Sequence, residues 1–178
     1  MRQIRIVPYD SRWPDQFGEE ANELAAIFGQ EFAAIHHIGS TAVPGLWAKP
    51  IIDVLVEVRD VETLDGFDQK MTERGCVPKG EFGIPGRRFF IGGNEERRTH
   101  HIHMFEVGGP EPERHLNFRD YLIAHSEEAR VYGRLKQELA REFRHDIESY
   151  AAGKEAFIKE VERKAVLWTR RRRAPGSS

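Results

Sequence analysis

A glycine–serine turn between two apolar segments constrains this chain more than any other feature. Residues 32–38 are rich in strand-forming side chains and stop at Gly39, and Ser40 follows with a hydroxyl where the N-cap of a short helix would need one. Backbone N–H groups at such a turn point outward with the positive end of the helix dipole, which suits a phosphate. The sequence therefore predicts that Gly39, Ser40 and Thr41 hold the phosphate groups of a ligand.

A single carboxylate near the start of the next apolar segment, residues 51–58, is the second feature. Side chains alternate along a strand, so every second residue from Ile52 to Val58 forms a core face, and Asp53 projects from the opposite face. A lone carboxylate in an apolar strand is costly unless it is paired, hydrogen-bonded or metal-bound. Asp53 is therefore either a ligand of a metal that also binds phosphate oxygens, or a buried acid that holds nearby backbone N–H groups.

Two histidines in a later predicted strand, residues 99–107, could complete a metal site. His101 and His103 share one face of that strand, about 7 Å apart at a rise of ~3.3 Å per residue. That spacing permits both imidazoles to reach one ion, or one to ligate while the other acts as acid or base. The alternative is a polar sheet face with ordinary hydrogen-bonded histidines. We expect Asp53, His101 and His103 to converge as catalytic residues and metal ligands, with Mg²⁺, Mn²⁺ or Zn²⁺ as the ion.

Basic residues near the turn could neutralise the ligand's phosphates. Lys49 shortly precedes Asp53, and pairs of arginines stand at residues 87–88 and 97–98. Arginine forms bidentate contacts with phosphate, so an arginine pair close to a phosphate turn could hold a triphosphate. We select Lys49 and Arg88 as ligand-binding cations. Exposed arginines of a hairpin are the commoner case, and this alternative stays open.

The rest of the chain predicts one α/β (α+β) domain, with a mixed sheet and a helical C-terminal layer. Strands are expected at residues 3–7, 32–38, 51–58, 88–92 and 99–107, the last two joined as a hairpin. Helices are expected from residue 13 to Gly29, over 60–75 and 112–125, after a cap at Ser126, and around 157–168. We assign residues 1–172 to the single domain and 173–178 to a flexible tail.

Composition limits the compartment and the partners. The chain has 178 residues, of which 39% are hydrophobic and 31% charged, and a net charge of −2 argues against a nucleic-acid-binding surface. Cys76 is the only cysteine, residues 1–5 contain no apolar signal sequence, and no segment approaches the roughly 18 apolar residues of a membrane span. We expect a cytoplasmic protein that binds a small phosphorylated ligand and no membrane. The oligomeric state stays open.

The order of these motifs resembles the GrpB family. The resemblance rests on residues 37–41, 43–46, 49–53, 101–103 and 118–122, with Tyr9, Asp10, Trp13 and Pro14 before them and Tyr150, Lys154, Phe157 and Ile158 after them. It covers nearly the whole chain. It implies a nucleotidyltransferase fold and a nucleotide as ligand. It also implies a link to coenzyme A synthesis, because some GrpB proteins are fused to an enzyme of that pathway.

The resemblance also exposes a departure from the active enzymes of the superfamily. Those enzymes pair the glycine–serine turn with two acids one residue apart on the next strand, and with a third acid on a neighbouring strand. Here Asp53 supplies the first acid, Leu55 stands in place of the second, and His101 and His103 stand where the third is expected. Metal-dependent nucleotidyl or phosphoryl transfer is the leading hypothesis. The alternatives are a non-catalytic ligand-binding or interaction module and a zinc-dependent phosphohydrolase.

Overall fold

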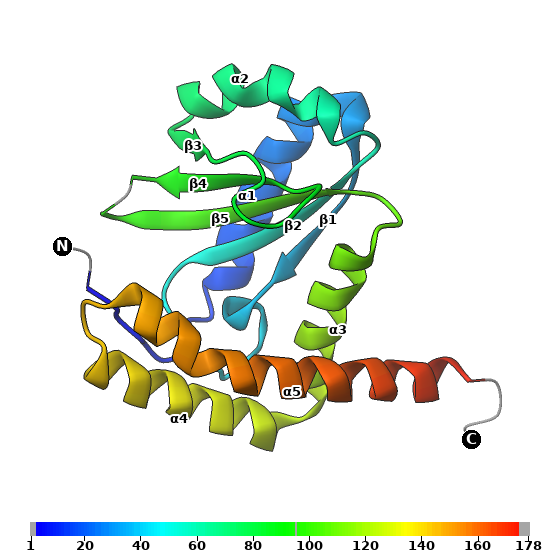
Figure 1. The fold of residues 1–178 in the computed structure, drawn as a ribbon. Helices are drawn as coiled ribbons and strands as arrows, with labels where there is room; N and C mark the ends of the chain where they lie inside the picture. Colours follow the sequence, from blue (N-terminus) through cyan, green and yellow to red (C-terminus); the bar gives the residue numbers. More distant parts are fainter. Residues whose placement is uncertain (1–2, 95, 175–178) are drawn as a thin grey trace.

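The computed structural model describes residues 3–94 and 96–174, which form a mixed five-stranded sheet with helices packed around it (Figure 1). The strands are β1 (Phe32–Ile38), β2 (Ile52–Val58), β3 (Cys76–Pro78), β4 (Arg88–Gly93) and β5 (Arg98–Glu106). Their order in the sheet is β1-β2-β5-β4-β3, with β2 and β5 parallel and the other neighbours antiparallel. The predicted mixed α/β fold is confirmed.

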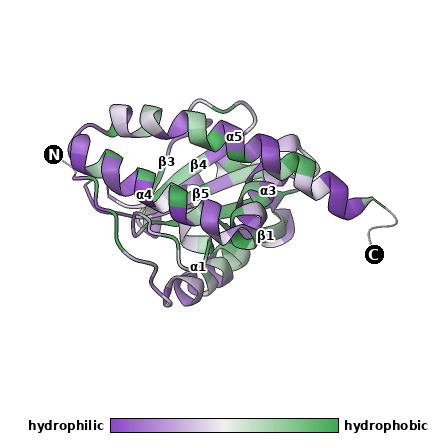
Figure 2. Cartoon of the chain, turned by 90° about the horizontal axis from the view of Figure 1, so that it is seen from below, coloured by the Kyte–Doolittle hydropathy of each residue, from purple (hydrophilic) through white to green (hydrophobic). Residues whose placement is uncertain are grey.

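The helices cover the sheet from two sides. The α-helices are α1 (Trp13–Phe28), α2 (Asp68–Glu73), α3 (Pro110–Ala124), α4 (Ser126–Glu142) and α5 (Ile147–Arg173), and the short 3-10 helices are η1 (Gly29–Glu31), η2 (Ser40–Ala42) and η3 (Glu62–Phe67). Helices α1 and α2 pack with one face of the sheet in the main core. Helices α3, α4 and α5 pack together in a second hydrophobic core. Along each of these helices hydrophobic residues alternate with hydrophilic ones (Figure 2). The predicted helical C-terminal layer is therefore present.

Strand β2 lies inside the sheet, between β1 and β5, as its largely apolar sequence predicts. Val54 and Val56 are fully buried in the core beneath α1. On the opposite face Leu55 is fully buried against Ile38 and Phe105. Both faces of β2 are therefore covered, so the strand holds its side chains in fixed positions.

The parallel pairing of β2 with β5 sets the geometry of the predicted site. In its register Asp53 lies opposite His101, and Leu55 lies opposite His103. Paired residues of adjacent strands project from the same face of a sheet. The predicted adjacency of the acid strand and the histidine strand is therefore confirmed.

Two of the predicted elements differ from the structure, and one strand was not predicted. Residues 3–7 are no strand, because Ile4 donates its N–H to Arg144 near the end of α4, and only an isolated bridge joins Val7 to Ala48. The helix predicted over residues 60–75 is divided into η3 and α2. The edge strand β3, only three residues long, was too short for its apolar pattern to be recognised.

The C-terminal helices also differ in detail from the prediction. Ser126 is the first residue of α4 and makes no capping hydrogen bond, since His125 takes the N-cap position. The predicted tail begins at Arg173, which is the last residue of α5, and residues 175–178 lie outside the described part of the chain. Within residues 3–94 and 96–174, no helix combines the length and apolar character that a membrane span requires.

Leu55→Ala tests whether the space of the missing second acid is a packed core. Because Leu55 is fully buried, its truncation should lower the free energy of unfolding by about 2–5 kcal/mol, measured by urea denaturation. Ile123→Ala, at a side chain that is 48% exposed, should cost less than about 1 kcal/mol. Equal costs for the two variants would contradict the packing described for β2.

Candidate functional site

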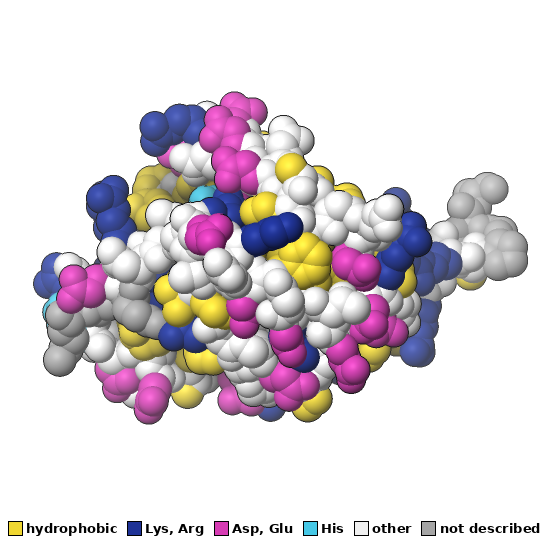
Figure 3. Space-filling view, turned by 90° about the horizontal axis from the view of Figure 1, so that it is seen from above, with side chains coloured by type: hydrophobic (Ala, Val, Ile, Leu, Met, Phe, Trp, Pro, Cys, Tyr) yellow, Lys and Arg dark blue, Asp and Glu magenta, His cyan; other side chains and the backbone are white. Residues whose placement is uncertain are grey.

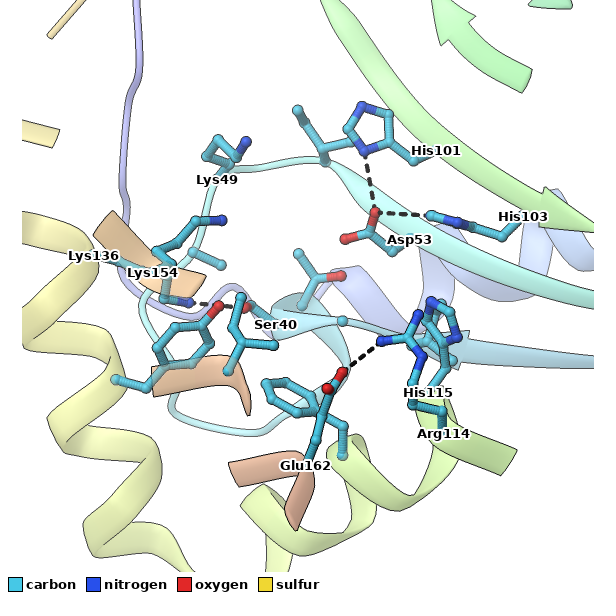
Figure 4. A pocket seen from close by; sticks show the side chains of 18 of the residues that line it. Ser40, Lys49, Asp53, His101, His103, Arg114, His115, Lys136, Lys154 and Glu162 are labelled. Carbon is cyan, nitrogen blue, oxygen red and sulfur yellow. Dashed lines mark hydrogen bonds and ion pairs between the residues drawn. The ribbon is translucent and has the colours of Figure 1, made fainter. Parts of the chain in front are cut away.

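A cavity of about 300 Å³ lies where the start of β2 meets the glycine–serine turn and the C-terminal helices (Figure 4). It brings together seven of the eight predicted site residues: Gly39, Ser40, Thr41, Lys49, Asp53, His101 and His103. Helices α3, α4 and α5 add further polar side chains that the sequence analysis did not assign to the site: Arg114, His115, Lys136, Tyr150, Lys154 and Glu162. The cavity therefore joins the sheet to the helical layer.

The glycine–serine turn is built around a close approach of Gly39 to Asp53. Gly39 has φ +70°, and a Cβ added to it would lie 2.5 Å from Asp53 Oδ2. Only glycine fits both the backbone conformation and this distance. Gly39 itself holds the N-cap position of η2, so the predicted capping role of Ser40 is wrong.

The hydroxyl groups of the turn have different partners. The Ser40 hydroxyl accepts a hydrogen bond from Lys136 Nζ at 2.8 Å, and this lysine comes from α4. The Thr41 hydroxyl pairs with His37 Nε2 at 2.8 Å, and Thr41 is almost fully buried. The Ser40 hydroxyl therefore connects the turn to the helical layer, whereas the Thr41 hydroxyl stabilises the turn by its contact with His37.

Asp53 lies between the two histidines, as expected. His101 Nδ1 is 3.1 Å from Asp53 Oδ1, and His103 Nε2 is 3.8 Å from the same oxygen. Burial alone would raise the pKa of Asp53, but the two imidazole groups outweigh it and hold that pKa well below its usual range. Asp53 is therefore a stable carboxylate whose Oδ1 faces two ring nitrogens.

Arg87 determines which nitrogen of His103 carries the proton. This arginine is 5% exposed, and its Nη1 lies 3.3 Å from His103 Nδ1. A guanidinium can only donate hydrogen bonds, so Nδ1 must be the acceptor and Nε2 must carry the hydrogen. Burial also lowers the pKa of His103, which favours the neutral ring. His103 therefore directs an N–H group toward Asp53.

Arg88, the other arginine of this pair, does not reach the cavity. Its guanidinium is paired with Asp65 at 2.6 Å. Arg87 lies in the loop just before β4 and Arg88 is its first residue, and their side chains turn to different partners, His103 and Asp65. The arginine that approaches the predicted site is Arg87, and it acts on His103 rather than in the cavity.

Three lysines from three different segments line the cavity: Lys49 before β2, Lys136 from α4 and Lys154 from α5 (Figure 4). Lys136 is only 3% exposed, and its Nζ contacts the Ser40 hydroxyl and the Tyr132 ring. Among the described residues, no carboxylate forms an ion pair with Lys136. Burial lowers the pKa of Lys136 well below its ordinary value, and the charges of Lys154 and Lys49 lower it further. An ammonium group in this position is costly until an anion joins it.

The wall opposite the lysines carries a compensated charge cluster. Arg114 of α3 forms ion pairs with both Glu111 and Glu162. His115 beside it has its pKa lowered to about 4, mainly by burial, and is neutral at pH 7. The charge of Arg114 is therefore balanced by carboxylates, whereas Lys136 on the side of Ser40 has no such ion pair among the described residues.

The molecule does not present a uniform basic surface on the face shown in Figure 3. On the face of the molecule in Figure 3, basic and acidic side chains are interspersed. The position of Lys136 could have been recognised from the helical period, because it lies four residues after Tyr132 and three before Leu139, both buried. A lysine on the buried stripe of a helix is unusual and indicates a function.

A divalent ion at Asp53, His101 and His103 stays a prediction. The three side chains converge, but residues 3–94 and 96–174 contain no group of three His, Cys, Asp or Glu side chains arranged to hold a metal ion. His101 donates Nδ1–H to Asp53, and its Nε2 is buried with no hydrogen-bond partner in the described chain. His101 Nδ1–H and His103 Nε2–H both face Asp53 Oδ1, so neither of these two nitrogens has a lone pair for an ion shared with that carboxylate.

Comparison with known proteins places these observations in a family. A family model described as "GrpB protein" matches residues 3–164. The chain is 49% identical to the UPF0157 protein YqkA of Bacillus subtilis (strain 168), covering 99% of this chain and 51% of YqkA. The crystal structure of the conserved protein GrpB from Enterococcus faecalis matches with a TM-score of 0.89 and 39% identity, over 93% of this chain and 99% of that one.

A more distant similarity is to the dephospho-CoA kinase of Mycolicibacterium paratuberculosis. It is 26% identical over 93% of this chain, which spans 46% of the kinase. The chain thus spans about half the length of YqkA and of this kinase.

Substituting alanine at Gly39 and, as a matched control, at Gly45 separates backbone strain from the contact with Asp53. Both glycines have positive φ, but an added Cβ meets Asp53 Oδ2 at 2.5 Å at Gly39 and nothing within 4 Å at Gly45. Gly45→Ala should therefore cost only the backbone strain, about 1–3 kcal/mol. Gly39→Ala should cost about 1–3 kcal/mol more in urea denaturation, because Asp53 must move. Equal costs would show that the turn does not press on Asp53.

Proposed function

The chain belongs to the GrpB family, and we propose that its cavity binds a small phosphorylated ligand, such as a nucleotide or a coenzyme A precursor. The observation that carries this proposal is Lys136, a buried amino group without a carboxylate partner among the described residues. Burying a charge without a counter-ion is unfavourable, and a bound anion supplies that counter-ion. The free-energy cost of burying Lys136 without a counter-ion thus favours binding of an anion.

The turn and the lysines together offer the contacts that a phosphate group requires. The Ser40 hydroxyl and Lys136 Nζ already lie 2.8 Å apart and would both donate to one phosphate. Lys49 and Lys154 line the same cavity and bring two further ammonium groups, enough for a second phosphate. The Gly39 backbone fits between this region and Asp53 because it has no side chain.

The remaining lining favours a ligand with an apolar or ring-shaped part beyond its phosphates. Phe118 and Ile158 also line the cavity, and the rings of Tyr132 and Tyr150 pack against Lys136 and Lys154. Aromatic and apolar walls with a few polar groups are usual for sites of nucleotides and other cofactors. The similarity to proteins named dephospho-CoA kinase makes coenzyme A precursors a reasonable first set to screen.

Transfer of a phosphoryl or nucleotidyl group is the second candidate function. The observation in its favour is the Asp53–His101 pair, since a carboxylate that orients an imidazole is a common arrangement for general-base catalysis. Against it, Leu55 is fully buried where the active enzymes of the superfamily have a second acid. A binding module that retains the pocket is therefore the better-supported alternative.

Lys136→Met tests the proposal, because it removes the charge while retaining a long apolar side chain. Wild-type protein should be stabilised by about 2.7 kcal/mol when inorganic phosphate or AMP is present at a hundred times its dissociation constant. Loss of a charge-assisted contact worth about 1.5–3 kcal/mol should weaken binding roughly tenfold to a hundredfold in calorimetric titration. Without ligand, the variant should be equally stable, or more stable by about 1–4 kcal/mol, because a buried unpaired charge is gone.

Lys159→Met is the matched control, since the Lys159 side chain is 71% exposed and lies outside the cavity. It should alter neither ligand binding nor stability measurably. If Lys136→Met and Lys159→Met bind phosphate and AMP equally well, Lys136 is not part of a ligand site, and the proposal fails.

A further inference from the structure

We infer that this cavity holds phosphate through its lysines without a bridging divalent ion, because Arg87 keeps His103 from acting as a metal ligand. The inference rests on the proposed function and specifies how the anion is held. It departs from the metal site that the sequence analysis predicted, and it depends on the hydrogen-bond donors and acceptors around Asp53.

The proton of His103 lies on the nitrogen that would have to bind a metal. A histidine that ligates a metal through Nε2 normally carries its proton on Nδ1 and donates it to a carboxylate or a carbonyl. Here Nδ1 lies 3.3 Å from the Arg87 guanidinium, which has no acceptor atom. A proton on Nδ1 would face another N–H group, so ligation through Nε2 is disfavoured.

Arg87 cannot easily move away from this position. Its Nη2 donates to the carbonyl of Phe82 at 2.6 Å and its Nε donates to the carbonyl of Glu81 at 3.1 Å. Its guanidinium also packs against the Phe89 ring, and the residue is 5% exposed. The loop that precedes β4 therefore fixes the guanidinium, and the guanidinium fixes the proton of His103.

The Asp53 carboxylate faces both histidines and the turn. His101 donates its Nδ1–H to Asp53 Oδ1, and His103 directs Nε2–H at the same oxygen. Oδ2 faces Gly39 so closely that a Cβ there would lie 2.5 Å away. Asp53 thus accepts a hydrogen bond from His101 and faces the N–H group of His103, and its role is to hold both rings and the turn in place.

The lysines of the cavity can take the place of a metal ion as the source of positive charge. In a metal-dependent site, the ion neutralises both the acids and the phosphate oxygens. In this chain one such acid is replaced by the buried Leu55, while Lys49, Lys136 and Lys154 line the cavity. These lysines can therefore supply the positive charge that a bound phosphate requires, without an added divalent cation.

The test is calorimetric titration of the full chain with inorganic phosphate, first in EDTA and then in excess Mg²⁺ or Mn²⁺. The inference predicts dissociation constants within about twofold of one another. Tightening by tenfold or more with either ion would overturn it while leaving phosphate binding intact. Absence of phosphate binding in every buffer would instead overturn the proposed function.

Nitrogen-15 NMR of the histidine side chains gives an independent reading that needs no ligand. The expected forms are His103 with its proton on Nε2 and His101 with its proton on Nδ1, unchanged when Zn²⁺ is added alone. A proton on Nδ1 of His103, or a metal-bound shift of either ring on adding Zn²⁺, would overturn the inference.

Discussion

The parallel register of β2 and β5 is the constraint on which the rest of the site depends. It sets Asp53 opposite His101 and Leu55 opposite His103, so one carboxylate meets two imidazoles on a single face of the sheet. The same carboxylate approaches Gly39 too closely for any side chain, which fixes the turn relative to β2. A slip of one residue in this register would reverse every side chain and separate these groups.

The helical layer supplies what the sheet lacks. Lys136 and Lys154 come from α4 and α5, and both reach the cavity beside a turn that precedes β2. The burial of an ammonium group is offset only when an anion is present, so the packing of these helices and the affinity for ligand are linked. The site therefore combines a rigid floor of sheet residues with a positively charged wall of helix residues.

Much of the fold follows from local sequence patterns. One face of β2 is entirely apolar and Leu55 is apolar on the other, so a buried interior strand was predictable, and the glycine turn and Asp53 stood out against that background. The hairpin of β4 and β5 was predicted as well. The N-terminal segment was not, because Ile4 is held by a hydrogen bond to Arg144 rather than by a neighbouring strand.

The contact between Lys136 and the turn could not be derived from spacing alone. Lys136 is 96 residues from Ser40, and only the packing of α4 against the turn brings them together. Likewise, local pattern cannot decide between Arg87 and Arg88. That choice depends on whether a side chain meets Asp65 or His103. In each case the deciding contact is between residues far apart in sequence.

The central claim is that the cavity between Ser40 and the lysines is an anion site. A crystal structure of the protein grown with saturating AMP tests it most directly. The account predicts the phosphate within hydrogen-bond distance of the Ser40 hydroxyl and Lys136 Nζ, with the rest of the ligand toward Phe118 and Ile158. AMP bound elsewhere, or an empty cavity at saturating AMP, would contradict it.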